Sequence, residues 1–232
     1  MSELKIRCSM LGKIMTPSRS KKDIMGKTCK TYIQDIFKEK ELGIIKEFWS
    51  RYITKGIDCE KKAIELANKV LEWELPFEAI HGKQHEFEND YLTGHTDVCT
   101  KTVLADVKTS WDGTTFPFFE DEIPNKDYYW QCMGYLALTG YDKCDLAYCL
   151  INTPEKMVLD EIRREHWKQD SFWDGDENPD IVKMVRSRHE FDHLPNELRV
   201  KNYIIERDEN AIKNIYERVE QCREYYEQLK TK

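Results

Sequence analysis

The sequence has no run of apolar residues long enough to cross a bilayer, because a membrane-spanning helix needs about 20 consecutive, mainly apolar residues. Its opening, Met1-Ser2-Glu3, also lacks the charged and apolar regions of a secretory signal peptide. We therefore expect a protein that acts in the cytoplasm and has no membrane partner.

Metal-binding cysteine pairs are missing as well. The eight cysteines form no C-x-x-C pair and the six histidines show no metal-ligand spacing, which argues against zinc and against an iron–sulfur cluster. We expect the thiols to be reduced. The chain also has no internal repeat and no low-complexity linker, and with 40% apolar residues it can bury one core. These features predict a single domain over residues 1–232.

What the chain does contain is two acids and a lysine on a predicted β-hairpin. Residues 97–109 read DVCTKTVLADVKT. Because side chains alternate along a strand, Asp106 and Lys108 should share one face. The turn can bring Asp97 beside Asp106, which would place two carboxylates and an ammonium at one point. Mg²⁺ prefers such oxygen ligands, with room left for water and a phosphate. The alternative is an ordinary solvated edge strand.

A predicted helix upstream carries a third acid. Residues 59–73 read CEKKAIELANKVLEW, and Glu60 lies on the apolar stripe of Ile64, Ala67 and Leu71. A buried acid is costly unless it has a partner, so Glu60 could face the metal. Alternatively, Glu60 lies near the helix start and complements the helix dipole, or stays solvated.

A second helix is predicted over residues 127–140, which read DYYWQCMGYLALTG, with Gly140 as its end. Gln131 and Tyr135 are four residues apart and lie on one face. A glutamine on a largely buried helix needs a hydrogen-bonding partner. A metal-bound water or a phosphate could supply one, although Tyr135 could also be ordinary core and Gln131 a surface residue.

The order of these elements is α-β-β-β-α-β. A strand is predicted around residues 86–92 before the hairpin, and another over 145–152 after the second helix. In this order and in its motifs, the chain resembles the PD-(D/E)xK nucleases, and within them the RecB-type branch that includes YqaJ-like phage exonucleases such as lambda exonuclease. The matching segments are Gly56-x-x-x-Glu60, Gly94-His95-Thr96-Asp97, Asp106-Val107-Lys108, Gln131-x-x-x-Tyr135 and the opening Ile6-Arg7-Cys8-Ser9-Met10-Leu11-Gly12.

Two positions depart from the family pattern. Thr96 stands where the superfamily name has proline, and Asp106 stands where glutamate is common. The shorter aspartate removes one methylene from the ligand. The resemblance still implies an α/β, restriction-endonuclease-like fold with a central mixed sheet flanked by helices. Its core would span about residues 56–152, with a basic helical segment before it and a strand and helix after it.

The resemblance also implies a site and an activity. Asp97, Asp106, Glu60 and the Val107 carbonyl would bind Mg²⁺, for which Mn²⁺ could substitute, and Lys108 would act on the attacking water. Gln131 and Tyr135 would position this set. The expected enzyme is a metal-dependent deoxyribonuclease that digests duplex DNA 5′ to 3′ for homologous recombination. A phage origin, a bacterial host cytoplasm, a trimeric ring and a single-strand annealing partner are implied in the same way.

The charge distribution is compatible with DNA binding. The net charge is −7, but residues 1–62 hold 15 Lys/Arg against 8 Asp/Glu, while residues 63–232 hold 21 against 35. A local basic face can bind phosphates while the rest stays acidic. Arg19, Lys21 and Lys22 are candidate DNA contacts, although a charge-rich surface without a partner is the common alternative. The resemblance adds Ser9, at the position of a serine that holds a DNA phosphate in the family.

Two other functions stay open. The same fold could be a structure-specific or single-strand DNA endonuclease, or a catalytically silent module that only binds DNA or acts as a scaffold. The remaining sequence predicts a long loop over residues 112–127, a surface loop over 170–180, a strand over 200–206 and an amphipathic helix over 208–230.

Overall fold

The computed structural model describes residues 4–20, 23–47, 49–82, 85–169 and 178–231. Its strands are β1 (Ile6–Arg7), β2 (His85–Glu88), β3 (Leu92–Thr96), β4 (Val98–Cys99), β5 (Leu104–Thr109), β6 (Lys143–Cys149) and β7 (Val200–Glu206). Its α-helices are α1 (Leu11–Met15), α2 (Lys27–Leu42), α3 (Arg51–Leu71), α4 (Phe77–His81), α5 (Lys126–Thr139), α6 (Glu155–Lys168), α7 (Pro179–His189) and α8 (Glu209–Lys230), with 3-10 helices η1 (Cys8–Met10) and η2 (Asn196–Arg199). Within these ranges, no helix is long and apolar enough to span a membrane.

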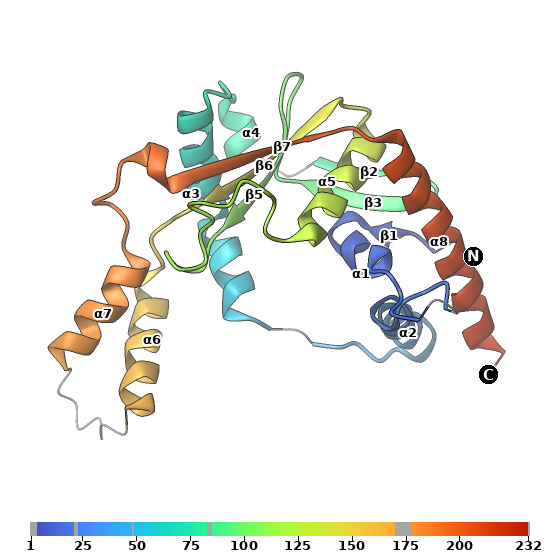
Figure 1. Ribbon diagram of the computed structural model, residues 1–232, viewed down its shortest axis with the longest axis horizontal. Coiled ribbons are helices and arrows are strands. Elements are labelled where there is room, and N and C mark those ends of the chain that lie inside the picture. The colour runs from blue at the N-terminus through green and yellow to red at the C-terminus, as the bar shows by residue number, and fades with distance from the viewer. Residues whose placement is uncertain (1–3, 21–22, 48, 83–84, 170–177, 232) are drawn as a thin grey trace.

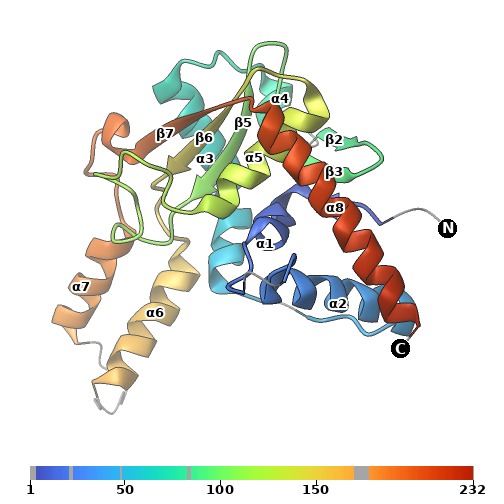
Figure 2. The same ribbon diagram turned by 45° about the vertical axis from the view of Figure 1, so that its right-hand side comes forward.

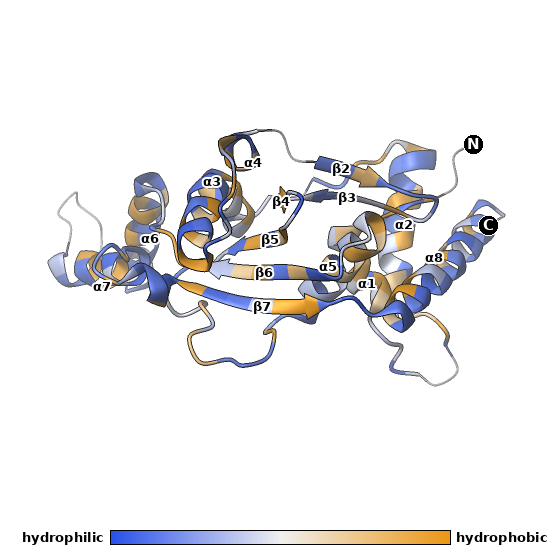
Figure 3. Cartoon of the chain, turned by 90° about the horizontal axis from the view of Figure 1, so that it is seen from above, coloured by the Kyte–Doolittle hydropathy of each residue, from blue (hydrophilic) through white to orange (hydrophobic). Residues whose placement is uncertain are grey.

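The strands form two sheets that lie beside one another (Figures 1 and 3). The first has the order β1-β3-β2, with β1 parallel and β2 antiparallel to β3. The second has the order β4-β5-β6-β7, in which only β5 and β6 run parallel. The predicted mixed α/β fold flanked by helices is therefore confirmed, but the expected single central sheet is two sheets. The chain passes from one to the other between β3 and β4.

Helices cover both faces of the four-stranded sheet. On one face α3 packs against β5, where Ala105 and Val107 join the buried side chains of the helix. On the other face α5 covers Leu146 of β6, and α1 and α8 complete that core. The alternation predicted for β5 is confirmed, because Ala105 and Val107 face α3 while Asp106 and Lys108 face α5.

Several predicted elements have different bounds in the structure; the strand expected over residues 145–152, for example, is β6 (Lys143–Cys149). The helix expected over residues 59–73 already begins at Arg51, because the Ser50 side chain accepts a hydrogen bond from the Tyr52 N–H and caps it. The strand expected over residues 86–92 is instead two strands. The Asn89 side chain accepts from the N–H groups of Tyr91 and Leu92, and this turn separates β2 from β3.

In the later part of the chain, the predictions agree with the structure at β7 and α8 but not between β6 and β7. Strand β7 has the predicted bounds and α8 begins after Asp208, whose carboxylate caps it. No regular element lies between β5 and α5, as predicted for the loop of residues 112–127. Helices α6 and α7 were not predicted; they form a hairpin that extends from the body (Figure 2). Residues 170–177 of the predicted surface loop lie outside the described residues.

Helix α8 holds the N-terminal elements in place. The Arg223 guanidinium donates to the Leu4 carbonyl at 3.0 Å, and the Arg218 guanidinium donates to the Ile24 carbonyl at 2.6 Å. Helix α2 packs against the C-terminal part of α8 (Figure 2), where Gln34 donates to the Tyr225 hydroxyl at 2.8 Å. The basic N-terminal segment thus depends on the C-terminal helix for its position.

Candidate active site

Asp97 lies where the chain leaves one sheet and enters the other. The pairing of β4 with β5 extends only to Val98 and Ala105, so the Val107 N–H has no β4 partner. The Asp97 carboxylate takes that place, and its Oδ2 accepts from the Val107 N–H at 2.7 Å. The separation of the two sheets therefore directs a carboxylate toward the strand that carries Asp106.

Asp106 is fully buried and its carboxylate is held from two sides. Its Oδ1 accepts a hydrogen bond from Gln131 Nε2 at 2.9 Å, and Gln131 Nε2 in turn lies 2.7 Å from the Tyr135 hydroxyl. Its Oδ2 forms an ion pair with Lys108 Nζ at 2.6 Å. Gln131 and Tyr135 are themselves buried. The structure thus brings Asp106, Lys108, Gln131 and Tyr135 together, although their catalytic roles stay a prediction.

The charged groups in this cluster shift one another's pKa values. Burial, and then repulsion from Asp106, raises the pKa of Asp97 from 3.8 to about 7. Burial disfavours the Lys108 ammonium, but attraction by Asp106 and Asp97 outweighs it and raises the pKa of Lys108 above its usual range. Burial, with the same two acids, raises the pKa of Tyr135. The site therefore has a cationic lysine beside acids whose joint ionisation is unfavourable.

Glu60 lies in the middle of α3 rather than near its start. The dipole alternative for this residue is wrong, because the helix begins at Arg51 and dipole effects fade after the first turn. Glu60 is half-buried, and its charge acts on Asp97 by raising the pKa of that acid. However, α3 packs on the β5 face opposite Asp106, so Glu60 approaches the cluster from the Asp97 side.

The residues are of the type that binds a divalent cation, but they supply few donor atoms. Asp97 and Asp106 supply carboxylate oxygens, and neutralising their mutual repulsion is what a hard cation would do. In the described part of the chain, no group of three or more His, Cys, Asp or Glu side chains gathers as a metal cluster. A cation here would thus rely on two close carboxylates, with the Val107 carbonyl and water as further donors.

Two glycines let the N-terminal segment approach the site. A Cβ at Gly94 would lie 2.9 Å from Cys8 Sγ and 3.0 Å from the Tyr135 ring, and one at Gly134 would lie 2.5 Å from Leu11. Helix η1 therefore packs closely against β3 and α5. Ser9 is exposed on this helix, directly after the buried Cys8. The neighbouring Cys8 lies close enough to Asp106 that the Asp106 charge contributes to the raised pKa of the Cys8 thiol.

The candidate DNA contacts further along the chain are only partly described. Arg19 is exposed and lines a pocket of about 700 Å³ between α1 and α2, together with Lys13 and Lys27. Lys21 and Lys22 lie outside the described residues. The basic segment therefore has a concave surface, and whether it contacts DNA stays a prediction.

Sequence reasoning missed one residue beside Lys108. Tyr148 of β6 is paired in register with Lys108 and lies on the same face. Lys108 Nζ lies 4.8 Å from the centre of the Tyr128 ring, which packs edge-on against Tyr148. The alternation of Leu146, Tyr148 and Leu150 in the sequence would have indicated this face only once the parallel pairing with β5 was known.

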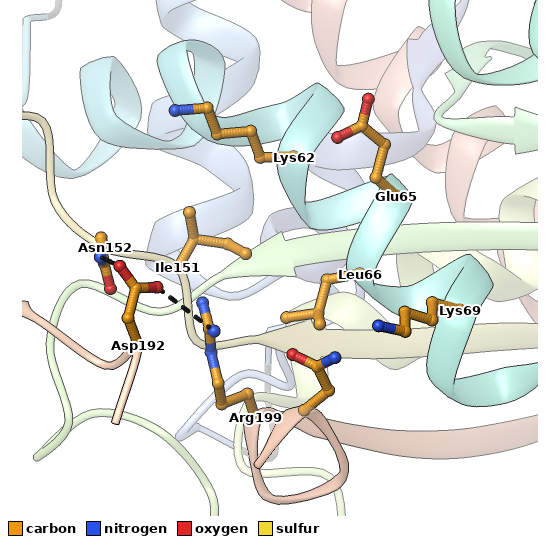
Figure 4. A pocket seen from close by; sticks show the side chains of 9 residues that line it. Lys62, Glu65, Leu66, Lys69, Ile151, Asn152, Asp192 and Arg199 are labelled. Carbon is orange, nitrogen blue, oxygen red and sulfur yellow. Dashed lines mark hydrogen bonds and ion pairs between the residues drawn. The ribbon is translucent and has the colours of Figure 1, made fainter. Parts of the chain in front are cut away.

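A separate pocket of about 380 Å³ contains none of the predicted catalytic residues. It lies between the outer side of α3 and the chain after β6 (Figure 4). Asp192 there accepts from the Asn152 amide at 2.7 Å and pairs with Arg199 at 3.6 Å. Asp192 and Arg199 are thus paired with one another, and the pocket offers no argument for catalysis.

Comparison with solved structures finds several nucleases that share this fold. A phage-related exonuclease from Haemophilus somnus 129PT is 28% identical over 99% of this chain and 96% of its own, with a TM-score of 0.76. An alkaline exonuclease from Laribacter hongkongensis is 16% identical over 98% of this chain and 92% of its own, with a TM-score of 0.62. A structure of the latter with dAMP gives a TM-score of 0.59.

No protein-family model and no curated protein matches the sequence. The structural similarity nevertheless extends over nearly the whole chain, and at 28% identity the first of these neighbours is similar in sequence as well. The fold and these neighbours confirm the resemblance inferred from the motifs: the chain is similar to the YqaJ-like branch of the PD-(D/E)xK nucleases.

Proposed function

We propose that the protein is a divalent-metal-dependent deoxyribonuclease that removes nucleotides from the ends of duplex DNA. One observation carries this proposal: two carboxylates and a lysine converge at one site, with Asp97 accepting from the Val107 N–H and the buried Asp106 paired with Lys108. A fold with no catalytic role has no need of converging acids that repel one another. The exonucleases that share the fold support the same conclusion.

Mg²⁺ is the expected cofactor, held by Asp97, Asp106 and the Val107 carbonyl, with Glu60 completing the shell directly or through water. When bound, it would supply a water of lowered pKa and neutralise charge on the scissile phosphate. Mn²⁺ should substitute, since it also prefers oxygen ligands in an octahedral arrangement.

The protein's own groups have distinct tasks in this mechanism. The Lys108 ammonium orients the attacking water and stabilises the negative charge that grows on the phosphate oxygens. Gln131 fixes the Asp106 carboxylate through its hydrogen bond at 2.9 Å, and the Tyr135 hydroxyl fixes Gln131. Because Gln131 and Tyr135 are buried, they hold the Asp106 carboxylate in place before DNA arrives.

The DNA would approach from the side of the N-terminal segment. Ser9 is exposed beside the cluster, and Arg19 lines the basic pocket. With Lys21 and Lys22, they would hold backbone phosphates without reading bases. The 5′-to-3′ direction, the role in recombination, the trimeric ring and the annealing partner rest on the family resemblance alone.

The test is digestion of linear and circular duplex DNA, labelled separately at the 5′ and 3′ ends, with Mg²⁺ or with EDTA. We expect Mg²⁺-dependent loss of linear DNA, with the 5′ label released first. Asp106→Asn keeps the acceptor for Gln131 and should be inactive. Nicking of circles would instead indicate the endonuclease, and DNA binding without cleavage would indicate the silent module.

A further inference from the structure

Tyr148 lies beside the catalytic cluster without a function assigned to it so far. On β6 it is paired in register with Lys108 of β5 on one side and with Lys201 of β7 on the other. Side chains paired in this way on neighbouring strands share a face and lie about 5 Å apart at their Cβ atoms. Tyr148 is 7% exposed, so the structure buries it next to the lysine of the site.

The hydroxyl of Tyr148 is buried and has no hydrogen-bond partner among the described residues. The neighbouring Tyr203 differs in this respect. The centres of the Tyr203 and Tyr148 rings are 5.8 Å apart. The Tyr203 hydroxyl donates to the Glu120 carbonyl at 2.9 Å. A buried hydroxyl without a partner destabilises a protein, and phenylalanine would fill the same space without this cost. The hydroxyl therefore needs an explanation other than packing.

Lys108 offers one, because a bound metal ion would repel its ammonium from the present position. The ammonium lies 2.6 Å from Asp106 Oδ2, where a cation held by Asp97 and Asp106 would repel it. Its flexible stem allows the ammonium to move. On the sheet face the ammonium already lies over the Tyr128 ring. The centres of the Tyr128 and Tyr148 rings are 6.1 Å apart. The Lys108 charge also acts on Tyr148, whose pKa burial nevertheless raises.

We propose that Tyr148 is a positioning residue whose hydroxyl accepts a hydrogen bond from the Lys108 ammonium when a divalent cation occupies Asp97 and Asp106. The hydroxyl has no partner without metal because the ammonium is then paired with Asp106. With metal, it holds the ammonium on the sheet face beside the reacting phosphate. This inference rests on the proposed nuclease function.

The first test measures stability without any substrate. Thermal unfolding of Tyr148→Phe is compared with wild type in EDTA and in saturating Mg²⁺. Without metal, loss of the unpartnered hydroxyl should raise Tm by about 2–4 °C. With Mg²⁺ this gain should vanish or reverse, because wild type then has a bond that the variant lacks. Tyr203→Phe is the matched control and should lower Tm in both conditions, since it loses a satisfied bond. An equal gain for Tyr148→Phe in both conditions overturns the proposal.

The second test separates positioning from packing by kinetics. At saturating Mg²⁺, Tyr148→Phe should lower kcat by about 10-fold to 100-fold, the usual effect of losing a hydrogen bond to a charged group, while KM for DNA stays unchanged. In a Lys108→Met background the same substitution should have no further effect on kcat. A normal kcat in Tyr148→Phe, or equal losses in both backgrounds, contradicts the proposal.

The outcomes also distinguish this inference from the function on which it rests. A wild-type protein that Mg²⁺ neither stabilises nor activates would refute the proposed nuclease, and with it this role of Tyr148. An active, Mg²⁺-stabilised wild type with an unaffected Tyr148→Phe variant would leave the nuclease standing and refute only the positioning role.

Discussion

Burial and the charge of Asp106 both act on Asp97, and the effect on its titration should be measurable without metal. The folded protein holds the pKa of Asp97 near 7 rather than 3.8. A carboxyl with a raised folded-state pKa favours folding while protonated, and that contribution is lost as pH rises from about 4 through 7.

Asp97→Asn removes this titration and keeps a carbonyl oxygen for the Val107 N–H. In metal-free protein, we therefore expect the variant to gain stability over wild type progressively from pH 4 to pH 7, with a plateau above pH 7. Urea unfolding of both proteins across this range measures the difference. A stability difference that does not change with pH would show that Asp97 does not titrate in this range.

Glu60 allows a sharper test than the sequence alone suggested, because its position in the middle of α3 excludes a role at the helix end. Glu60→Gln keeps the shape of the side chain but removes one negative charge near Asp97. DNA cleavage should fall strongly, and higher Mg²⁺ or Mn²⁺ should restore part of it, since mass action offsets weaker metal binding. Glu65→Gln, on the exposed side of the same helix, should cleave DNA normally. Full activity of Glu60→Gln would remove Glu60 from the site.

At the scale of elements, the end of β5 depends on a buried lysine of α3. Lys55 is 1% exposed, and its ammonium donates to the carbonyls of Ser110 at 2.8 Å and Trp111 at 2.7 Å. Burial lowers the pKa of Lys55 to about 8, but a neutral amine still has two hydrogens to donate. The contact therefore joins the helix that carries Glu60 to the strand that carries Asp106 and Lys108 on both sides of that pH.

Lys55→Met should leave those two carbonyls without their donor. The free energy of unfolding, measured in urea, should fall by about 1–3 kcal/mol. Lys62→Met is the control on the exposed side of α3 and should change stability by less than about 0.5 kcal/mol. Equal effects of the two substitutions would show that the buried contact contributes nothing.

Elements that repeat a simple pattern could be predicted from the sequence, and those set by tertiary contacts could not. Alternation along β5 correctly placed Asp106 and Lys108 on one face. The start of α3 was missed because Tyr52, Ile53 and Ile57 are exposed apolar residues that interrupt the amphipathic pattern. The division into two sheets also has no local signal, since it depends on where β3 and β4 find their partners.

Helices α6 and α7 show the same limit. Their buried residues Val158, Ile162, Ile181 and Val185 pack mainly against one another. Each helix therefore depends on the other to bury its apolar face. For the candidate site, the sequence supplied the acids, the lysine and the glutamine, but Tyr148 required the register between β5 and β6.

For the whole molecule, the uneven charge predicts how DNA binding should respond to salt. Replacing Arg19, Lys21 and Lys22 by glutamine should weaken binding to all DNA sequences alike. The slope of log affinity against log salt should become shallower by about 1–3, because each lost phosphate contact releases about one counterion fewer. The same change at Lys61, Lys62 and Lys69, exposed on α3, is the matched control. An unaltered slope in the first variant would locate the DNA path elsewhere.

The dependence of the N-terminal segment on α8 has a consequence for biosynthesis. Ribosomes make the basic segment before α8, yet Arg218 and Arg223 of α8 fix the chain around Ile24 and Leu4. During translation, Asp97 and the strand with Asp106 can therefore come together before the surface expected to hold DNA is anchored. A nascent chain would hold both acids before its expected DNA-binding surface is anchored. We therefore expect DNA degradation only once α8 has left the ribosome.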